Sequence, residues 1–466
     1  MSHKKPFTAN ERRRDLLKLG LGAAIAAPVL SVAGNASANS VRTNAHIVIS
    51  GAGAGGISIA NRFARSLPGA RITIIDSREA HHYQPGWTLV ASGVWNKDKT
   101  LSKTGEWLPS SVNWVRGMVT EYNPDSNQVS VSNGETISYD YLIVACGLQL
   151  RYERIEGMDT GLIGQGKGIG SVYAGIEEAK ATGDEITRWI AKGSGTGLFN
   201  LPPTALKCAG APLKMTFTTL SRLEDSGKRD NFNVEFMTPS GGLFGVPFYN
   251  DFVKQRFTEQ GVTRNDFWTL TGIDADTRKA FYSVKGERTG TATSHHYTDD
   301  GDAAEPTVWE ETKDFEFIHV VPPMTAPDSL LNSPLKFADD SPFRDWMEVD
   351  RETLQNPNYP NVWGIGDVMG MPSNKTAASV KMQANVLEQN FLAYLQDRPL
   401  PARHNGYTSC PLITGIGKAM LVEFGWDSVL LPSFSFIDPK EESWTVWVMK
   451  ERMLRPAYYA MLEGKI

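Results

Sequence analysis

Apolar residues occur in short runs separated by polar or glycine-rich turns, and the order of these runs predicts an α/β fold. An apolar run at 46–50 leads into glycines, residues 57–67 have helical spacing, and a second run at 71–75 ends at Asp76. Short apolar runs that alternate with amphipathic helices are typical of parallel sheets covered by helices. Beyond the N-terminus, uninterrupted apolar runs are shorter than a membrane-spanning helix requires.

The glycines after the first apolar run have the spacing of a dinucleotide-binding turn. Gly51 permits the tight turn, Gly53 lets the backbone approach a pyrophosphate, and Gly56 allows close packing of helix on strand. The N-terminus of the following helix offers free N–H groups to phosphates. Asp76, twenty residues after Gly56, is placed to accept hydrogen bonds from a ribose.

Two later segments favour FAD over NAD as the dinucleotide. Residues 139–147 form an apolar strand with a small-residue end, as in flavoprotein disulfide reductases where the chain passes the FAD, and residues 361–367 repeat a strand followed by Gly and Asp. The residues expected to contact FAD here are Cys146, Gly147, Gly366 and Asp367. We interpret Cys146 as a small buried residue, with a transient disulfide as the alternative.

Lys375 precedes the start of a predicted helix after the second of these segments. In this fold, that helix end points at the N1/O2 edge of the flavin, where negative charge collects on reduction. The helix dipole and the Lys375 ammonium would stabilise that charge. A solvated surface lysine is the alternative interpretation.

The middle of the chain predicts a second Rossmann-like domain without a nucleotide cradle. The strand near 197–201 runs into Pro202 and Pro203, and proline offers no N–H to a phosphate. The glycine-rich stretch 241–245 does not match the dinucleotide spacing, so no pyridine nucleotide is expected. His295 and His296 fall in a loop that we interpret as solvated rather than metal-binding.

The predicted organisation has two discontinuous domains and a C-terminal segment, because 466 residues exceed one ordinary core. It comprises an FAD-binding domain at 45–155 and 325–400, a second Rossmann-like domain at 156–324, and a segment at 401–466. The net charge of -5 and the lack of a basic tract argue against a nucleic-acid partner.

The N-terminus resembles an export signal. Three arginines at 12–14 precede an apolar run at 19–32 and a small-residue cleavage pattern at 36–38. We interpret residues 1–38 as a twin-arginine signal peptide and predict a periplasmic protein, with an uncleaved membrane anchor as the alternative. Three cysteines in an exported chain allow one disulfide and one spare thiol.

Four further motifs resemble the sulfide:quinone oxidoreductase family, in particular the branch that includes the mitochondrial enzyme. They lie at 81–90 (HHYQPGWTLV, with Pro85 expected at the cofactor), 207–212 (KCAGAP), 321–324 (VPPM) and 406–415 (GYTSCPLITG). The likeness runs over roughly residues 45 to 455.

The resemblance implies that Cys208 and Cys410 form a redox disulfide beside FAD, with Cys208 nearer the flavin. Sulfide would attack Cys410 and leave a persulfide there, and the Cys208 thiolate would pass two electrons to FAD and then to quinone. A small nucleophile would remove the outer sulfur. Lys207, next to Cys208, would supply charge for the leaving thiolate.

Several alternatives stay open at this point. A periplasmic cytochrome c could replace quinone as the electron acceptor, as in flavocytochrome c sulfide dehydrogenases. The protein could also be a non-catalytic flavin-containing sulfur carrier, and the cysteines a structural bridge or two buried thiols. The amphipathic stretch 450–462 could lie on a membrane surface or cap the core.

Overall fold

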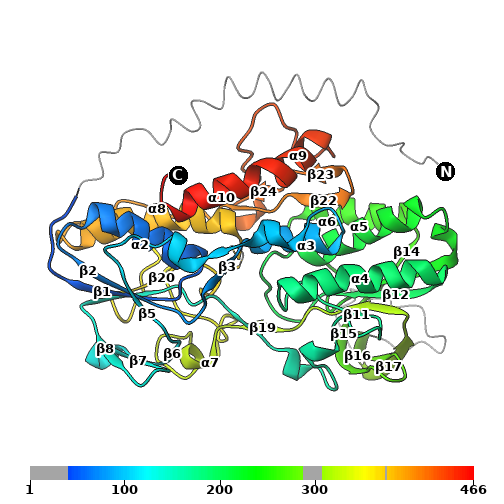
Figure 1. The fold of residues 1–466 in the computed structure, drawn as a ribbon, viewed down its shortest axis with the longest axis horizontal. Coiled ribbons are helices and arrows are strands. Elements are labelled where there is room, and N and C mark those ends of the chain that lie inside the picture. Colours follow the sequence, from blue (N-terminus) through cyan, green and yellow to red (C-terminus); the bar gives the residue numbers. More distant parts are fainter. Residues whose placement is uncertain (1–39, 287–306, 373–374) are drawn as a thin grey trace, which may run out of the picture.

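The computed structural model describes residues 40–286, 307–372 and 375–466. Two five-stranded parallel sheets lie side by side, with helices on one side and small antiparallel sheets on the other (Figure 1). The first sheet has the order β20 (Val362–Gly364), β9 (Tyr141–Val144), β1 (His46–Ser50), β2 (Arg71–Ile75) and β5 (Asn113–Val115). The second has the order β11 (Ile169–Gly170), β18 (Phe317–His319), β12 (Gly195–Asn200), β13 (Phe232–Thr238) and β14 (Val262–Asp266). The predicted α/β fold with two Rossmann-like cores is confirmed.

The remaining elements cover these sheets. The helices are α2 (Ala54–Ser66), α3 (Trp87–Ala91), α4 (Ile176–Lys192), α5 (Ala211–Asp225), α6 (Pro247–Glu259), α7 (Asp328–Leu331), α8 (Ala377–Tyr394), α9 (Trp444–Val448) and α10 (Leu454–Leu462). Two three-stranded antiparallel sheets consist of β6 (Val119–Asn123), β7 (Gln128–Val131) and β8 (Thr136–Ser138), and of β15 (Trp268–Asp274), β16 (Lys279–Gly286) and β17 (Thr307–Asp314). Two-stranded ribbons pair β3 (Ala80–His82) with β4 (Leu101–Lys103), β10 (Gln149–Leu150) with β19 (Met324–Thr325), β21 (Thr408–Ser409) with β24 (Glu423–Phe424), and β22 (Leu412–Gly415) with β23 (Lys418–Met420).

Steric contact explains why the first turn requires glycine. Gly51 has a φ of +104°, and a Cβ built on it would lie 2.5 Å from the Ala145 carbonyl oxygen. A Cβ on Gly56 would lie 1.8 Å from the Gly51 carbonyl oxygen. These close approaches hold α2 against the ends of β1 and β9, so that the N-terminus of α2 faces the edge of the sheet.

The two sheets share one continuous hydrophobic core. It begins at the apolar run of β1, whose Ile47, Val48 and Ile49 are fully buried, and it extends through α5 to β13. A second cluster fills the space between the second sheet and the β15–β17 sheet. Strands buried on both faces account for the unbroken apolar runs in the sequence.

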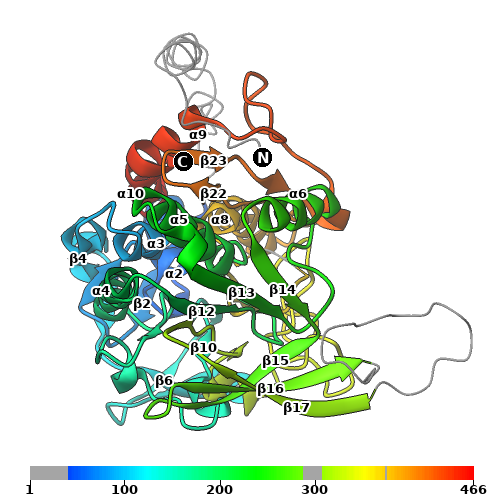
Figure 2. The same cartoon turned by 90° about the vertical axis from the view of Figure 1, so that its right-hand side faces the viewer.

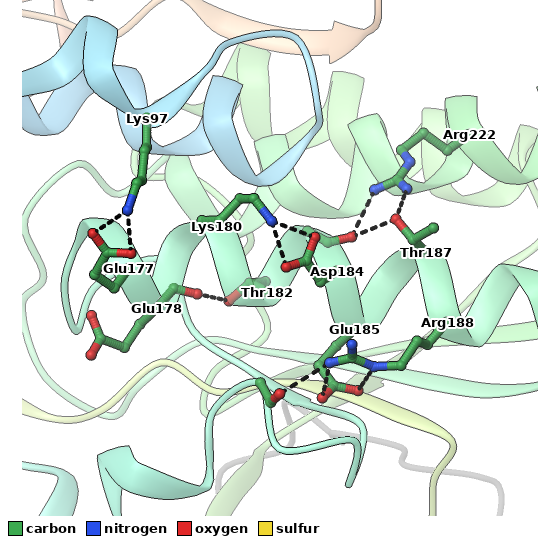
Figure 3. A network of polar contacts seen from close by, with 12 residues as sticks. Lys97, Glu177, Glu178, Lys180, Thr182, Asp184, Glu185, Thr187, Arg188 and Arg222 are labelled. Carbon is green, nitrogen blue, oxygen red and sulfur yellow. Dashed lines mark hydrogen bonds and ion pairs between the residues drawn. The ribbon is translucent and has the colours of Figure 1, made fainter.

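Helix α4 joins the two halves of the molecule through an apolar face and a polar face. Its buried residues Ala179, Thr182, Ile186 and Trp189 follow helical spacing. On the polar side, Lys97 from the first half donates to Glu177 at 2.6 and 2.7 Å (Figure 3). Exposed ion pairs of this kind contribute little, so the apolar face provides most of the attachment.

Glu185 on α4 fixes the turn that precedes it, and we expect its replacement to destabilise the fold. Its carboxylate is 2% exposed and accepts from the backbone N–H groups of Gly166 and Gly168 at 2.5 and 3.2 Å, and from Arg188 at 2.6 Å. Glu185→Ala would leave both N–H groups without an acceptor and should lower the free energy of unfolding by about 2 kcal/mol. Urea unfolding followed by circular dichroism measures this change.

Asp184→Ala is the matched control for that measurement. Asp184 is the next residue on α4, and its pair with Lys180 is about half exposed on both sides (Figure 3). Its loss should change the free energy of unfolding by less than about 0.5 kcal/mol. Equal effects of the two substitutions would contradict the role given to Glu185.

The C-terminal segment lies over the helical side of both sheets (Figure 2). Strand β22 packs against α5, and Ser428 Oγ donates to the carbonyl oxygen of Gly245 at 3.1 Å. The glycine-rich stretch 241–245 therefore contacts the protein's own C-terminal segment. A π-helical turn, Met449–Met453, joins α9 to α10.

Candidate functional site

A cavity of about 1930 Å³ opens between the two sheets and the C-terminal segment. This volume exceeds the range of about 300–1,000 Å³ that is usual for a single small ligand, and it leaves room for a dinucleotide and a second reactant. The residues predicted from the sequence that line it are Gly53, Pro85, Cys146, Gly147, Lys207, Cys208, Gly366, Asp367, Lys375 and Cys410. Gly51, Gly56 and Asp76 lie behind this lining and shape the turn.

The glycine turn can hold a pyrophosphate. Helix α2 has thirteen residues and no acidic side chain in its first turn, so its positive end is not neutralised. A Cβ on Gly53 would meet only the Arg78 guanidinium, at 3.9 Å, which leaves the backbone open to the cavity. The observed turn therefore fits the phosphate groups of FAD.

Asp76 is buried at the end of β2, as expected, but its oxygens already have partners. They accept from the Ala52 N–H at 2.7 Å and from the Arg78 Nε and Nη2 at 3.0 and 2.6 Å. Although burial alone would raise the pKa of Asp76, the hydrogen bonds and charge of Arg78 lower it below its ordinary value. The contact of Asp76 with a ribose stays a prediction, and Arg78 is a neighbour that the sequence analysis missed.

Cys208 and Cys410 are brought together from distant parts of the chain. Their Sγ atoms lie 3.7 Å apart, although 202 positions separate them in the chain. Cys208 lies in the turn before α5 with a φ of +49°, a conformation that is uncommon for residues other than glycine and that occurs often at functional sites. Cys410 lies between β21 and β22, where its N–H donates to the Val422 carbonyl at 2.9 Å.

Gly210 makes this approach of the two sulfurs possible. A Cβ on Gly210 would lie 2.9 Å from Cys410 Sγ. The glycine in the KCAGAP motif therefore leaves space for the second cysteine, which arrives with the C-terminal segment.

Lys214 is the ammonium that contacts both sulfurs. Its Nζ lies 3.0 Å from Cys410 Sγ and 3.4 Å from Cys208 Sγ, and the residue is 3% exposed. Burial disfavours its charge, but the two sulfurs raise the pKa of Lys214 above its ordinary value. Lys207, the lysine singled out from the sequence, instead donates to Gln84 Oε1 at 2.8 Å.

The pKa values of the two cysteines are shifted in opposite directions. The hydrogen bond from Cys208, followed by the charge of Lys214, lowers the pKa of Cys410 well below its ordinary value. The same hydrogen bond, together with burial, raises the pKa of Cys208. Of the two sulfurs, Cys410 is therefore the one that ionises more readily, and the thiolate is the nucleophilic form of the sulfur.

A second buried lysine approaches the pair from the C-terminal helices. Lys450, in the π-helical turn, is 2% exposed, and its Nζ donates to the Pro85 carbonyl at 2.6 Å. Burial, and then the charge of Lys214, lower the pKa of Lys450 to about 7. Single π-helical turns inside helices occur often at functional sites.

Lys375 is buried rather than solvated. It is 7% exposed, and its Nζ donates to the carbonyl oxygens of Asp367 and Met369 at 2.6 and 2.9 Å. Burial lowers the pKa of Lys375 to about 7 and raises that of Asp367. The adjacent N-terminus of α8 is capped by Thr376, whose Oγ1 accepts from the Ser379 N–H. Lys375 and the N-terminus of α8 therefore lie together in this wall of the cavity.

Cys146 lies against the glycine turn. Burial raises the pKa of its thiol to about 11, so the thiol is protonated near neutral pH. A Cβ on Gly51 would lie 2.8 Å from the Cys146 Cα. Cys146 is partly exposed and lines the cavity, so its role as a small residue at the cofactor stays a prediction.

Comparison with known proteins identifies the family. Residues 45–188 match the family model described as pyridine nucleotide-disulphide oxidoreductase. The chain is 34% identical over 416 residues to the mitochondrial sulfide:quinone oxidoreductase of Mus musculus, covering 89% of this chain and 86% of the mouse protein. The chain belongs to the sulfide:quinone oxidoreductase family.

Two other proteins of this name match over a similar share of the chain. The mitochondrial sulfide:quinone oxidoreductase of Dictyostelium discoideum is 32% identical over 422 residues, which cover 90% of this chain and 86% of that protein. The crystal structure of the Aquifex aeolicus sulfide:quinone oxidoreductase superimposes with a TM-score of 0.70 at 19% identity, over 90% of this chain and 92% of that chain. Membership of this family confirms that the chain is an oxidoreductase with FAD as its cofactor.

The predicted twin-arginine export to the periplasm is wrong in view of these relatives, because the mouse and Dictyostelium enzymes are mitochondrial. An arginine-rich start followed by apolar residues does not identify a compartment, since bacterial export signals and mitochondrial transit peptides are both rich in basic residues. The segment 1–38 on which the prediction was based lies outside the described residues, as do His295 and His296.

The amphipathic stretch at the C-terminus packs on the first sheet's helices. Ser58 Oγ donates to the Met461 carbonyl at 3.0 Å, and His81 Nε2 lies 2.8 Å from the Tyr458 hydroxyl. Met453 stays half exposed. Among the described residues, every helix is too short or too polar to cross a lipid bilayer. Contact with a membrane surface stays a prediction.

Proposed function

We propose that the chain oxidises sulfide through Cys208 and Cys410 and passes the electrons to a quinone. The observation that carries this proposal is the pair of sulfurs 3.7 Å apart, both in contact with Lys214, in a cavity lined by the FAD motifs. The mouse and Aquifex relatives are named for the same reaction.

The first step is thiol–disulfide exchange. In the oxidised enzyme the two sulfurs are joined, and HS⁻ attacks Cys410 Sγ. The S–S bond breaks, a persulfide forms on Cys410, and Cys208 leaves with the electron pair as a thiolate. Lys214 stabilises the leaving thiolate from 3.4 Å, and a stabilised leaving group accelerates such exchange.

The second step removes the outer sulfur. A small nucleophile attacks it, takes it away together with its proton, and leaves Cys410 as a thiolate whose pKa is already low. When the two thiolates rejoin, one electron pair is released. FAD, held at the glycine turn and beside the Gly366–Asp367 segment, would supply the acceptor for this pair and the route to the quinone.

Contacts around Cys208 support its place on the flavin side. The Cys208 N–H donates to the Lys375 carbonyl at 2.9 Å, and Lys375 follows the Gly366–Asp367 segment that we assign to FAD. Cys410 comes from the C-terminal segment, and its N–H donates instead to the Val422 carbonyl. This arrangement leaves the Cys410 side for sulfide and for the sulfur acceptor.

The experiment that tests the proposal is anaerobic addition of sulfide to the purified, FAD-loaded protein. We expect sulfide to bleach the flavin absorbance, a long-wavelength charge-transfer band to accompany the bleaching, and a soluble quinone to restore the oxidised spectrum. Cys146→Ser, compared at equal FAD content because Cys146 is expected to contact FAD, is the thiol control, and sulfide should still bleach its flavin.

Three other outcomes would contradict the proposal, each at a different step. An unchanged flavin spectrum, with FAD bound and both cysteines intact, would rule out the sulfide reaction. If only cytochrome c restored the oxidised spectrum, cytochrome c rather than quinone would be the electron acceptor. Bleaching that neither acceptor reverses would indicate a sulfur carrier.

A further inference from the structure

Trp346 is a buried aromatic residue that the steps above do not use, and its ring lies against Lys375. The Lys375 Nζ is 3.5 Å from the ring centroid, and Trp346 is 5% exposed. An ammonium over an aromatic face is stabilised by the ring quadrupole, most strongly by tryptophan and in sites without water. The ring therefore favours the charged form of Lys375.

The backbone next to Trp346 fixes the ring relative to the lysine. The Met347 N–H donates to the Val368 carbonyl at 3.0 Å, and the Gly370 N–H donates to the Met347 carbonyl at 2.9 Å. The turn that contains these partners also supplies both carbonyls that accept from Lys375. Ring and carbonyls thus form one rigid frame around the ammonium.

The charge of Lys375 is finely balanced within this frame. Burial lowers its pKa to about 7, and the Asp367 carboxylate acts in the opposite direction. Asp367 in turn lies near Lys207 and Cys208, which both act on its own pKa. Loss of one further stabilising contact would therefore discharge Lys375 near neutral pH.

We propose that Trp346 is a positioning residue that keeps Lys375 charged in the cavity wall, beside the edge of the FAD ring where negative charge collects. Two electrons and one proton convert the oxidised ring into an anion, and a fixed ammonium beside that anion favours reduction. The inference rests on the proposed position of FAD in the cavity and is independent of sulfide as the substrate.

The test is the reduction potential of the bound FAD, measured without sulfide by equilibration with a reference dye over the pH range around neutrality. Trp346→Met fills the space without a ring face and should lower the ratio of reduced to oxidised flavin about tenfold, which equals about 30 mV for a two-electron couple. In the wild type, the dependence of potential on pH should bend near pH 7, where Lys375 loses its proton. In Trp346→Met the bend in the potential should move to lower pH, because the Lys375 ammonium is less stable without the ring.

Three further variants make the result decisive. Lys375→Met should remove the bend, and Trp346→Phe should lie between the wild type and Trp346→Met because benzene is the weaker partner. Trp268→Met is the matched control: Trp268 is also 5% exposed, and its ring lies 5.3 Å from the Nζ of Lys313 in the β15–β17 region. It should leave the potential unchanged.

The inference would be overturned if Trp346→Met kept the wild-type reduction potential and the wild-type bend with pH while Lys375→Met changed both. If Trp346→Met does not retain FAD, Trp346→Phe serves as the test instead. A wild-type reduction potential in Trp346→Phe would then overturn the inference. Failure of sulfide to bleach the wild-type flavin would contradict the proposed function alone.

Discussion

Replacing Cys410 with serine is expected to lower the rate of FAD reduction by sulfide by at least about a thousandfold, the scale on which loss of a covalent nucleophile acts. Without Cys410 there is no disulfide for HS⁻ to open and no sulfur on which a persulfide can form. Stopped-flow absorbance of the flavin under anaerobic conditions measures the rate. Cys208→Ser should reduce it as severely.

The two serine variants should differ before sulfide is added. Cys410→Ser retains Cys208, which we propose lies on the flavin side, so a charge-transfer band should grow as the pH rises and Cys208 becomes a thiolate. Cys208→Ser should show no such band at any pH. The opposite pattern would place Cys410 next to the flavin and would reverse the roles of the two cysteines.

Lys214→Met is expected to have the second-largest effect, a loss of about 100- to 1,000-fold in the same rate. The estimate corresponds to removal of one fixed positive contact from a developing anion in a water-poor site. Lys214 lies within 3.4 Å of both sulfurs, so its loss weakens the Cys208 leaving group and the Cys410 thiolate together. Lys214→Arg, which keeps the charge, should recover part of the rate.

The loss should depend on pH in a defined direction. Without the ammonium, the pKa of Cys410 rises, so its thiolate forms at higher pH than in the wild type. The deficit of Lys214→Met should therefore shrink as the pH is raised. Lys207→Met is the matched control, because the Lys207 Nζ binds Gln84 and not a sulfur. A larger loss in Lys207→Met than in Lys214→Met would contradict this assignment.

Local features of the sequence were sufficient to predict the FAD-binding turn. Gly56 is required by its contact with the nearby backbone of Gly51, and Gly51 by its contact with Ala145 at the end of the neighbouring strand β9. The spacing of the two glycines therefore reflects the turn itself. The placement of Cys208 next to Cys410 followed instead from family resemblance. No short-range pattern states that residues 202 positions apart will meet.

Lys214, Lys450 and Trp346 were missed for the same physical reason. Each reaches the site through tertiary packing. Lys214 lies in the first turn of α5 and Lys450 in a π-helical turn. Trp346 lies in a loop whose next residue is hydrogen-bonded to Val368. Lys214 left one usable signal, since it lies one helical turn after Gly210 in the cysteine motif. Lys207 was preferred because it is adjacent in sequence, but a neighbour in sequence need not share a direction in space.

The pairing of β20 with β9 has a consequence for synthesis of the chain on the ribosome. Strand β9 ends at Val144, whereas its neighbour β20 begins at Val362, after the whole second sheet has been translated. In the N-terminal sheet, the β9 edge therefore stays unpaired while the second sheet is synthesised. The last strand of that second sheet, β18, ends at His319. Such an unpaired edge is prone to association with other chains, and pairing across so long a separation is slow. FAD loading is consequently expected only after β20 has been synthesised and paired, and the nascent protein should depend on chaperones until then.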